Sequence, residues 1–153
     1  MSRKPSILVV DDDSSIRKTL AAILEEKGYD VEAVETGGKA IEKAKSRFYN
    51  LALLDIRLPD MDGVELLTEM KETKPKMVKI MLTGYPSLQN AVEALNKGAD
   101  AYIIKPVDID KMLATIKDQL NKQRKAQKMT QDQLVQFIET RVQQLEQERL
   151  SRA

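Results

Sequence analysis

The chain has 153 residues, a net charge of +1 and neither cysteine nor histidine. This length accommodates one domain with its own core and a modest appendage. The near-neutral charge lacks the excess of basic residues that is typical of nucleic-acid-binding proteins. The lack of histidine excludes a Ser-His hydrolase and a histidine metal site. No apolar run approaches the roughly 18 residues of a membrane span, and no signal-like segment precedes the first strand pattern, so we expect a cytoplasmic location.

Short apolar runs alternate with helical patterns along the first 120 residues. Because strands that alternate with helices form βαβ units, we predict an α/β fold with a parallel sheet and right-handed crossovers. The second run alternates apolar and polar residues, which favours a strand at the sheet edge. The predicted strands are residues 7–10, 31–34, 51–54, 78–82 and 101–104, and helices are expected over 16–27, 38–44, 63–74, 88–97 and 109–120.

Residues with distinctive chemistry stand where four of these strands end. Asp11 and Asp12 follow the first strand and Asp55 follows the third, while Thr83 and Lys105 follow the last two. The carboxyl ends of parallel strands form the edge where open α/β sheets bind ligands. Three carboxylates crowded there repel one another, and a hard cation would relieve that repulsion. The sequence therefore predicts a site that combines three acids, a hydroxyl and an ammonium group.

The motifs V-V-D-D, L-L-D-I-R-L-P-D-M-D-G, M-L-T-G and Y-I-I-K-P resemble the receiver domain of two-component response regulators. The resemblance covers about residues 5–120, and the motifs agree with that family in order and spacing. It implies a doubly wound, five-stranded parallel sheet of order 2-1-3-4-5, flavodoxin-like, with a C-terminal helical extension. It also implies a regulatory domain that catalyses its own phosphorylation and dephosphorylation and switches conformation when phosphorylated.

The family's functional residues carry over onto matching positions. Asp55 would be the phosphoacceptor, and Mg²⁺ would be held by Asp11, Asp12, Asp55 and the backbone carbonyl of Arg57. A carboxylate is a recognised nucleophile for phosphoryl groups, and phosphoryl transfer depends mainly on positioning and on neutralising charge. Because the chain has no histidine, a partner must bring the phosphohistidine, either a sensor histidine kinase or a histidine phosphotransfer protein.

Lys105, Thr83 and Tyr102 complete the set that the resemblance implies. Lys105 would contact the phosphoryl group, with a cis peptide before Pro106 that aims it into the site. Thr83 and Tyr102 would form a switch pair, in which Thr83 donates to the new phosphoryl oxygens and Tyr102 turns inward.

Four further residues near these motifs have less distinctive predicted roles. Two bulky residues, Arg57 and Tyr85, would border the site, two positions after Asp55 and Thr83. Asp60 and Asp62 better fit turn and capping roles.

Two other classes of protein use related patterns. A dehalogenase-like phosphatase also has an aspartyl nucleophile, but it carries a second acid two residues later, where this chain has Arg57. A flavodoxin-like cofactor binder would need a phosphate loop rich in Ser, Thr and Gly after the first strand. The three consecutive acids at 11–13 would instead repel a phosphate that lacks a metal.

Composition changes after Lys122, so we divide the chain into a receiver domain, 1–121, and a helical tail or a linker to an absent output domain, 122–153. All six glycines and all five prolines precede residue 107, and residues 121–153 carry a net charge of +3. The segment predicts a long helix, although Thr130 to Gln133 fits a capping box that could start a second one. Val135, Ile138, Val142 and Leu145 have a and d spacing.

These features predict association between copies of the chain. We expect a homodimer through residues 85–120 or through the helix at 122–153, with no direct nucleic-acid contact and no membrane contact.

Overall fold

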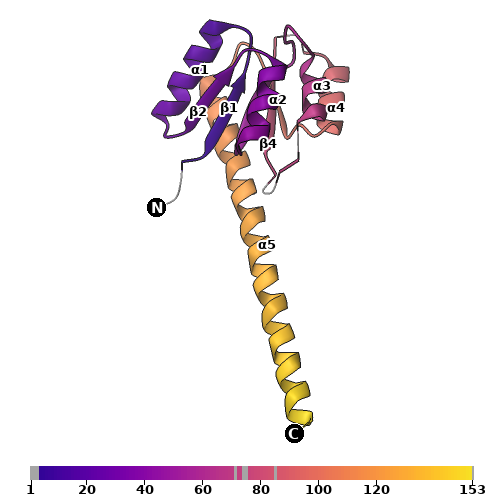
Figure 1. Ribbon diagram of the computed structural model, residues 1–153. Helices are drawn as coiled ribbons and strands as arrows, with labels where there is room; N and C mark the ends of the chain where they lie inside the picture. Colours follow the sequence, from indigo (N-terminus) through magenta and orange to yellow (C-terminus); the bar gives the residue numbers. More distant parts are fainter. Residues whose placement is uncertain (1–3, 71, 74–75, 85, 153) are drawn as a thin grey trace.

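The structure is a computed structural model that describes residues 4–70, 72–73, 76–84 and 86–152. Its five strands form one parallel sheet in the order β2-β1-β3-β4-β5, as the family resemblance implied (Figure 1). The central strands are buried on both faces, whereas β2 and β5 lie at the edges and are partly exposed. The strands are β1 (Ser6–Val10), β2 (Asp30–Val34), β3 (Leu51–Asp55), β4 (Val78–Thr83) and β5 (Ala101–Ile104).

Helices cover both faces of the sheet, which gives three layers. One face packs on α1 and α5 through Leu20, Leu24, Met112 and Ile116, and the other packs on α2, α3 and α4. Burial on both faces explains the continuous apolar character of the central strands. The helices are α1 (Ser14–Glu26), α2 (Gly37–Ser46), α3 (Gly63–Glu69), α4 (Leu88–Asn96) and α5 (Ile109–Ser151).

Each helix of the described chain begins at a residue whose side-chain oxygen accepts a backbone N–H from the first turn. The N-caps are Asp13, Thr36, Asp62, Ser87 and Asp108. Such caps satisfy donors that the helix itself leaves unpaired. Because every helix follows a strand, these N-termini gather at the carboxyl edge of the sheet, the edge that carries the candidate site.

Two helices differ from the prediction. The third was expected to reach about residue 74, but α3 ends at Glu69 because Met70 turns to an extended backbone, and its side chain is 3% exposed in the core. The alternative of a second helix starting at Thr130 is wrong, since α5 runs without a break from Ile109 to Ser151. At 1.5 Å per residue this helix is about 64 Å long.

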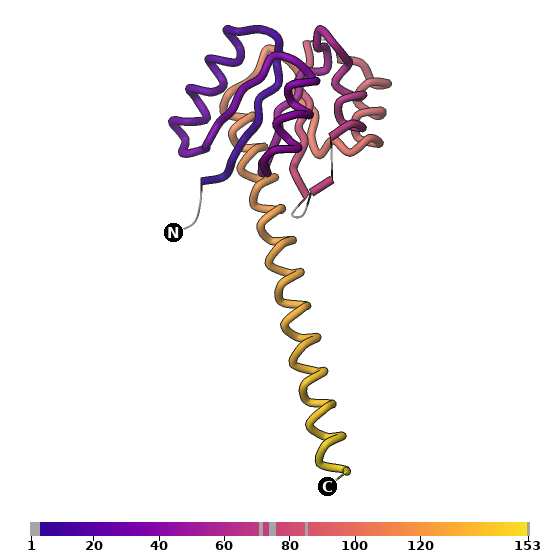
Figure 2. Tube along the Cα trace, viewed as in Figure 1, coloured from indigo at the N-terminus to yellow at the C-terminus, as the bar shows by residue number. Residues whose placement is uncertain are grey.

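The long helix leaves the domain at the amino edge of the sheet and continues alone (Figure 2). Gln123 anchors it at the point of departure. Its Nε2 donates to the carbonyls of Asn50 at 2.9 Å and Lys76 at 2.8 Å, and its Oε1 accepts from Asn50 Nδ2 at 3.2 Å. Every described residue after Gln123 is exposed. Within the described chain no helix is both long enough and apolar enough to cross a membrane.

Replacing Gln123 with Ala should loosen this attachment. The variant loses three hydrogen bonds that are each worth about 0.5–1.5 kcal/mol, so the free energy of unfolding should fall by about 1.5–4.5 kcal/mol. Amide exchange should also accelerate around residues 118–126. Gln136→Ala, on the exposed part of the same helix, is the control, and equal exchange in the two variants would contradict the anchoring role.

Candidate phosphorylation site

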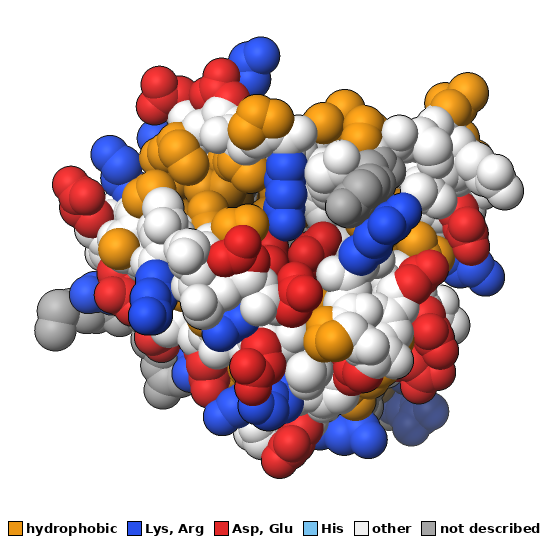
Figure 3. Space-filling model, turned by 90° about the horizontal axis from the view of Figure 1, so that it is seen from above, with side chains coloured by type: hydrophobic (Ala, Val, Ile, Leu, Met, Phe, Trp, Pro, Cys, Tyr) orange, Lys and Arg blue, Asp and Glu red, His pale blue; other side chains and the backbone are white. Residues whose placement is uncertain are grey.

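Three carboxylates lie together at the carboxyl edge of the sheet. Oxygens of Asp11, Asp12 and Asp55 all lie within 4.8 Å of one another, and they form the acidic cluster of the described chain that could hold a metal ion. Asp11 is 1% exposed and Asp55 is 7% exposed, whereas Asp12 faces solvent. Figure 3 views the molecule from this edge and shows acidic side chains near the middle of the face, beside basic and apolar ones.

Asp11 is held by contacts on both of its carboxylate oxygens. Its Oδ1 accepts the backbone N–H of Asp13 at 2.9 Å, and its Oδ2 accepts from Lys105 Nζ at 2.9 Å. Arg17 donates to the Asp11 carbonyl at 2.8 Å, which ties the start of α1 to the end of β1. Asp11 is therefore fixed in place, whereas Asp12 is exposed to solvent.

Asp55 is the last residue of β3 and is 7% exposed, so a small part of its surface reaches solvent. Its Oδ1 accepts the backbone N–H of Arg57 at 3.2 Å, and its Oδ2 lies 3.5 Å from Lys105 Nζ. Burial raises the pKa of Asp55 above its usual value, and the charge of Asp11 adds to that effect, against the N–H of Arg57 and the ammonium of Lys105. The ionised carboxylate is thus destabilised, and a cation bound beside it would stabilise it.

Lys105 follows β5 and lies between the two buried acids. The peptide that joins it to Pro106 is cis, as the sequence resemblance implied, and its backbone N–H donates to the Thr83 carbonyl at 2.7 Å. Burial lowers the pKa of Lys105, but the hydrogen bond to Asp11 and the charges of both acids outweigh it and leave the pKa raised. Lys105 is therefore a cation under ordinary conditions.

The predicted switch residues lie on neighbouring strands. Thr83 ends β4 with its side chain fully buried, and Tyr102 on β5 pairs with Met81 in the sheet register. The Tyr102 ring packs against the core, and its buried hydroxyl has no hydrogen-bond partner among the described residues. The hydroxyl is therefore buried, and the switch role of Thr83 and Tyr102 stays a prediction. Tyr85, expected to border the site, lies outside the described residues.

The loop from β3 to α3 contains features that the sequence reasoning missed. A Cβ built on Gly63 would lie 2.5 Å from the Asp55 carbonyl and 2.8 Å from Ile56 Cα, so only glycine fits there. Asp60 accepts the backbone N–H groups of Gly37 at 2.9 Å and Gly38 at 2.8 Å, and these bonds lower its pKa. The short spacing between Asp60 and Gly63 hinted at a tight turn but gave no sign of the link to α2.

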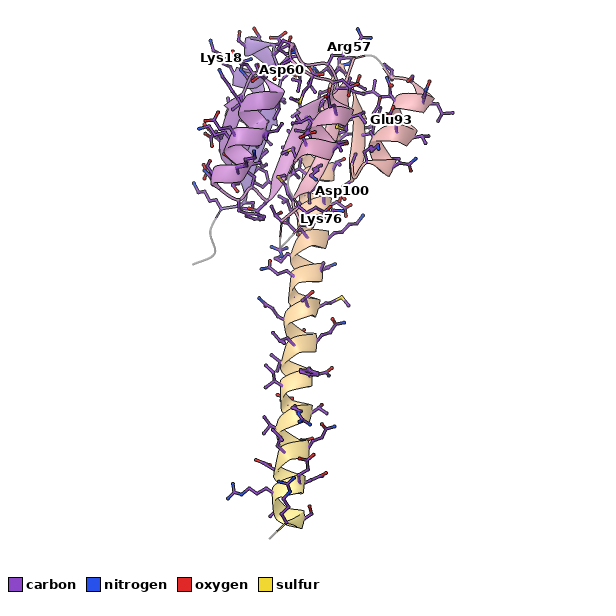
Figure 4. The ribbon with its side chains drawn as sticks, turned by 45° about the vertical axis from the view of Figure 1, so that its right-hand side comes forward. Lys18, Arg57, Asp60, Lys76, Glu93 and Asp100 are labelled. Carbon is purple, nitrogen blue, oxygen red and sulfur yellow. The ribbon has the colours of Figure 1, made fainter. Side chains whose placement is uncertain are left out.

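The two ends of the domain carry different groups. Arg57 and Asp60 lie at the end farthest from the tail, and Lys76 and Asp100 lie where α5 leaves (Figure 4).

Beside the acidic cluster, between α1 and the start of α5, is a hollow of about 330 Å³ with a largely apolar lining. It is lined by Ser15, Ile16, Thr19, Leu20, Lys105, Pro106, Val107 and Ile109.

An acidic cluster, a half-buried lysine and a hydroxyl at the carboxyl edge of a 2-1-3-4-5 sheet define a receiver-type α/β domain. Comparison with known proteins agrees, because the model of the response regulator receiver domain matches residues 7–117. The chain belongs to this family. This confirms the resemblance and does not favour the dehalogenase-like alternative.

Individual relatives show how far the likeness extends. The chain is 50% identical to a CheY-like response regulator receiver domain protein from Methanospirillum hungatei, covering 80% of this chain and 98% of that one with a TM-score of 0.77. It is 40% identical to the beryllofluoride-activated NtrC4 receiver domain dimer, covering 77% and 98% with a TM-score of 0.72.

A curated relative is a longer protein with a stated role. The transcriptional regulatory protein ZraR of Klebsiella oxytoca is 44% identical over 114 residues, which are 74% of this chain and 26% of ZraR. The chain therefore spans about a quarter of the length of this relative. Because it is named a transcriptional regulator, the comparison conflicts with the expectation that the protein makes no direct nucleic-acid contact, and we withdraw that expectation.

Gly63→Ala should destabilise the fold and disturb the site. The added methyl group meets backbone atoms that cannot move aside, and overpacking of this kind costs about 1–3 kcal/mol. Chemical denaturation measures the loss. Gly84→Ala is the matched control, since an added Cβ there meets nothing within 4 Å. Equal stability of the two variants would show that the loop accommodates a side chain at 63.

Proposed function

We propose that the chain is a phosphorylation-activated switch of a two-component phosphorelay and that Asp55 accepts the phosphoryl group. The observation that carries this proposal is the placement of Asp55, a partly shielded carboxylate at a strand end, 3.5 Å from Lys105 Nζ and within 4.8 Å of two other acids. The donor is a phosphohistidine on a sensor histidine kinase or a histidine phosphotransfer protein.

In the proposed reaction a carboxylate oxygen of Asp55 attacks the phosphorus atom, the P–N bond to the donor histidine breaks, and the histidine nitrogen leaves with that electron pair. The transferred group carries negative charge on its oxygens, and Lys105 is a compact cation already beside Asp55. The protein thereby promotes its own phosphorylation by positioning and by charge neutralisation. Later attack of water on the acyl phosphate restores Asp55 and releases phosphate.

The residues at the site fit a magnesium ion. Hard cations take carboxylate and carbonyl oxygens, and Mg²⁺ usually binds through one or two carboxylates, phosphate oxygens and water. Asp12, Asp55 and the carbonyl of Arg57 would hold the ion directly, and Asp11, which is only 1% exposed and is bonded to Lys105, would act through water. When bound, Mg²⁺ supplies neutralisation of the charge on the acids and on the phosphoryl group.

The apolar hollow between α1 and the start of α5 is the proposed docking place for the phosphohistidine partner. It reaches Lys105 at one side, and its walls include Ile16, Leu20 and Val107. A partner helix that covers this surface would bring its histidine to the carboxyl edge of the sheet. The surface is separate from the tail, so the whole of α5 beyond Gln123 stays free for other contacts.

Incubation with a small phosphodonor and Mg²⁺ should label Asp55 and no other residue. Mass spectrometry of peptides locates the modification. Asp55→Asn should abolish labelling because the amide is not a nucleophile of comparable strength. Asp60→Asn, an exposed acid in the same loop, should be labelled normally. Full labelling of the Asp55 variant would overturn the proposal.

Loss of Asp12 should weaken Mg²⁺ binding more than loss of Asp11. Mutation of residues that only hydrogen-bond to metal ligands lowers metal affinity by about 10–100-fold. Removal of Asp12, a direct ligand, should therefore lower the affinity for Mg²⁺ by at least about tenfold. Titration calorimetry compares Asp12→Ala and Asp11→Ala, with Asp118→Ala on the surface of α5 as the control. Unchanged affinity in both site variants would contradict the assignment of the metal ligands.

We further propose that Thr83 and Tyr102 relay phosphorylation to the surface formed by residues 85–120. A dianion on Asp55 offers the Thr83 hydroxyl a strong acceptor. The buried hydroxyl of Tyr102 has no hydrogen-bond partner among the described residues, which is a reason for that side chain to respond. Beryllofluoride should shift backbone NMR signals from the site through β5 into the start of α5. Thr83→Ala should confine the shifts to the site, whereas Thr68→Ala on the surface of α3 should not.

The remaining sequence predictions belong to the same proposal. Residues 1–121 form the receiver domain, and 122–153 form a helical tail or a linker to an output domain. Self-association occurs through residues 85–120 or through the tail, in line with the description of the related NtrC4 receiver domain as a dimer. The cytoplasmic location stays a prediction.

A further inference from the structure

The part of α5 beyond the domain has an apolar face that nothing in the described chain covers. Val135, Ile138, Val142 and Leu145 are 48–53% exposed. A helix of this kind has little reason to stay folded alone, because helical stability in water comes mainly from packing of an apolar face. The spacing of 3, 4 and 3 residues places the four side chains along one seam, as in the a and d positions of a coiled coil.

The side chains along this seam favour two parallel strands. Valine occupies both a positions, 135 and 142, while Ile138 and Leu145 occupy the d positions. Branching at Cβ in position a together with leucine in position d favours parallel dimers over larger assemblies; both a positions and Leu145 fit this rule, whereas Ile138 in the other d position does not. Lys128 and Arg149 would occupy the preceding and following a positions, so the apolar part of the seam is short and has a defined start and end.

Charges beside the seam distinguish the two relative directions. In a parallel pair, Arg141 in position g faces Glu146 in position e of the second copy, and symmetry forms this contact twice. In an antiparallel pair with Val135 opposite Leu145, the two Arg141 side chains would face each other. Glu146 of each chain would face Asp132 of the other. Like charges at such positions destabilise, so the pattern favours the parallel direction.

Arg141 and Glu146 are also free to make that contact. Within the described part of their own chain, Arg141 donates only to the Gln144 side chain, at 3.4 Å, and neither residue forms an ion pair. Surface charges elsewhere do pair within the chain, as Lys122 does with Asp118 on the same helix at 3.2 Å.

We propose that the tail binds a second copy of this chain as a parallel, in-register two-stranded coiled coil over about residues 131–148. This deepens the self-association proposed above by choosing the surface, the partner and the direction. The two receiver domains then lie at the same end of the coiled coil. Val135, the first residue of the seam, lies about 18 Å along α5 from the anchor at Gln123.

The oligomeric state of the full-length 153-residue chain tests the surface. Sedimentation equilibrium of the unphosphorylated chain should show a concentration-dependent dimer. Val142→Lys places two charges in the seam and should weaken the dimer by at least about 100-fold, because it removes two buried valines. Gln147→Lys adds the same charge on the outer face and should leave the dimer intact. A monomer at all concentrations, or equal effects of both substitutions, would overturn the proposal.

Cross-linking tests the direction. The chain contains no cysteine, so any disulfide in Leu145→Cys joins introduced residues. A parallel, in-register pair brings the two introduced sulfurs together, whereas an antiparallel pair separates them by about 15 Å. Oxidation should give a covalent dimer for Leu145→Cys and not for Gln147→Cys.

A charge reversal adds an independent readout of direction. Glu146→Arg should weaken a parallel dimer, because Arg141 then faces another arginine, and it should strengthen an antiparallel one, because the introduced arginine would face Asp132. Strengthening, or failure of Leu145→Cys to cross-link, would overturn the proposed direction. Repeating the sedimentation measurement on Asp55→Asn separates this inference from the proposed phosphorylation, since the coiled coil requires no phosphoryl group and should persist.

Discussion

The arrangement of the site depends on one contact, the ion pair between Lys105 and the buried acids Asp11 and Asp55. Three carboxylates at one sheet edge would repel one another, and two of them have little water to screen their charge. The ammonium of Lys105, 2.9 Å from Asp11 and 3.5 Å from Asp55, offsets that repulsion. It also joins β5 to β1 and β3, since the three residues stand at the ends of different strands. The same charge that stabilises the acids is therefore placed to meet an incoming anion.

The α/β class and the residues at the acidic edge could be predicted from the sequence because they follow from local rules, whereas the strand order came from the family resemblance. Continuous apolar runs identify buried strands, and residues directly after such strands must lie at one edge of a parallel sheet. Asp11, Asp55 and Lys105 could thus be brought together from the sequence alone. Asp12 could be placed beside them, and the structure adds that it faces solvent while Asp11 does not.

Other features needed the three-dimensional structure because they join elements far apart in the chain. Nothing near Asp60 indicates that it accepts N–H groups from Gly37 and Gly38, and nothing near Gln123 indicates its bonds to residues 50 and 76. The end of α3 was missed for a related reason. The helical pattern continues past Met70, but burial of the Met70 side chain in the core overrides the local preference.

The position of Gln123 gives α5 the mechanics of a lever. The helix begins at Ile109, four residues after Lys105, and passes the anchor about 21 Å further on, leaving about 42 Å between Gln123 and Ser151. If the helix moves as a stiff rod that pivots at the anchor, a shift at its first turn reappears at Ser151 in the opposite direction and about twice as large. A rearrangement of about half an ångström beside the acids would then become a displacement of about one ångström at the far end of the helix.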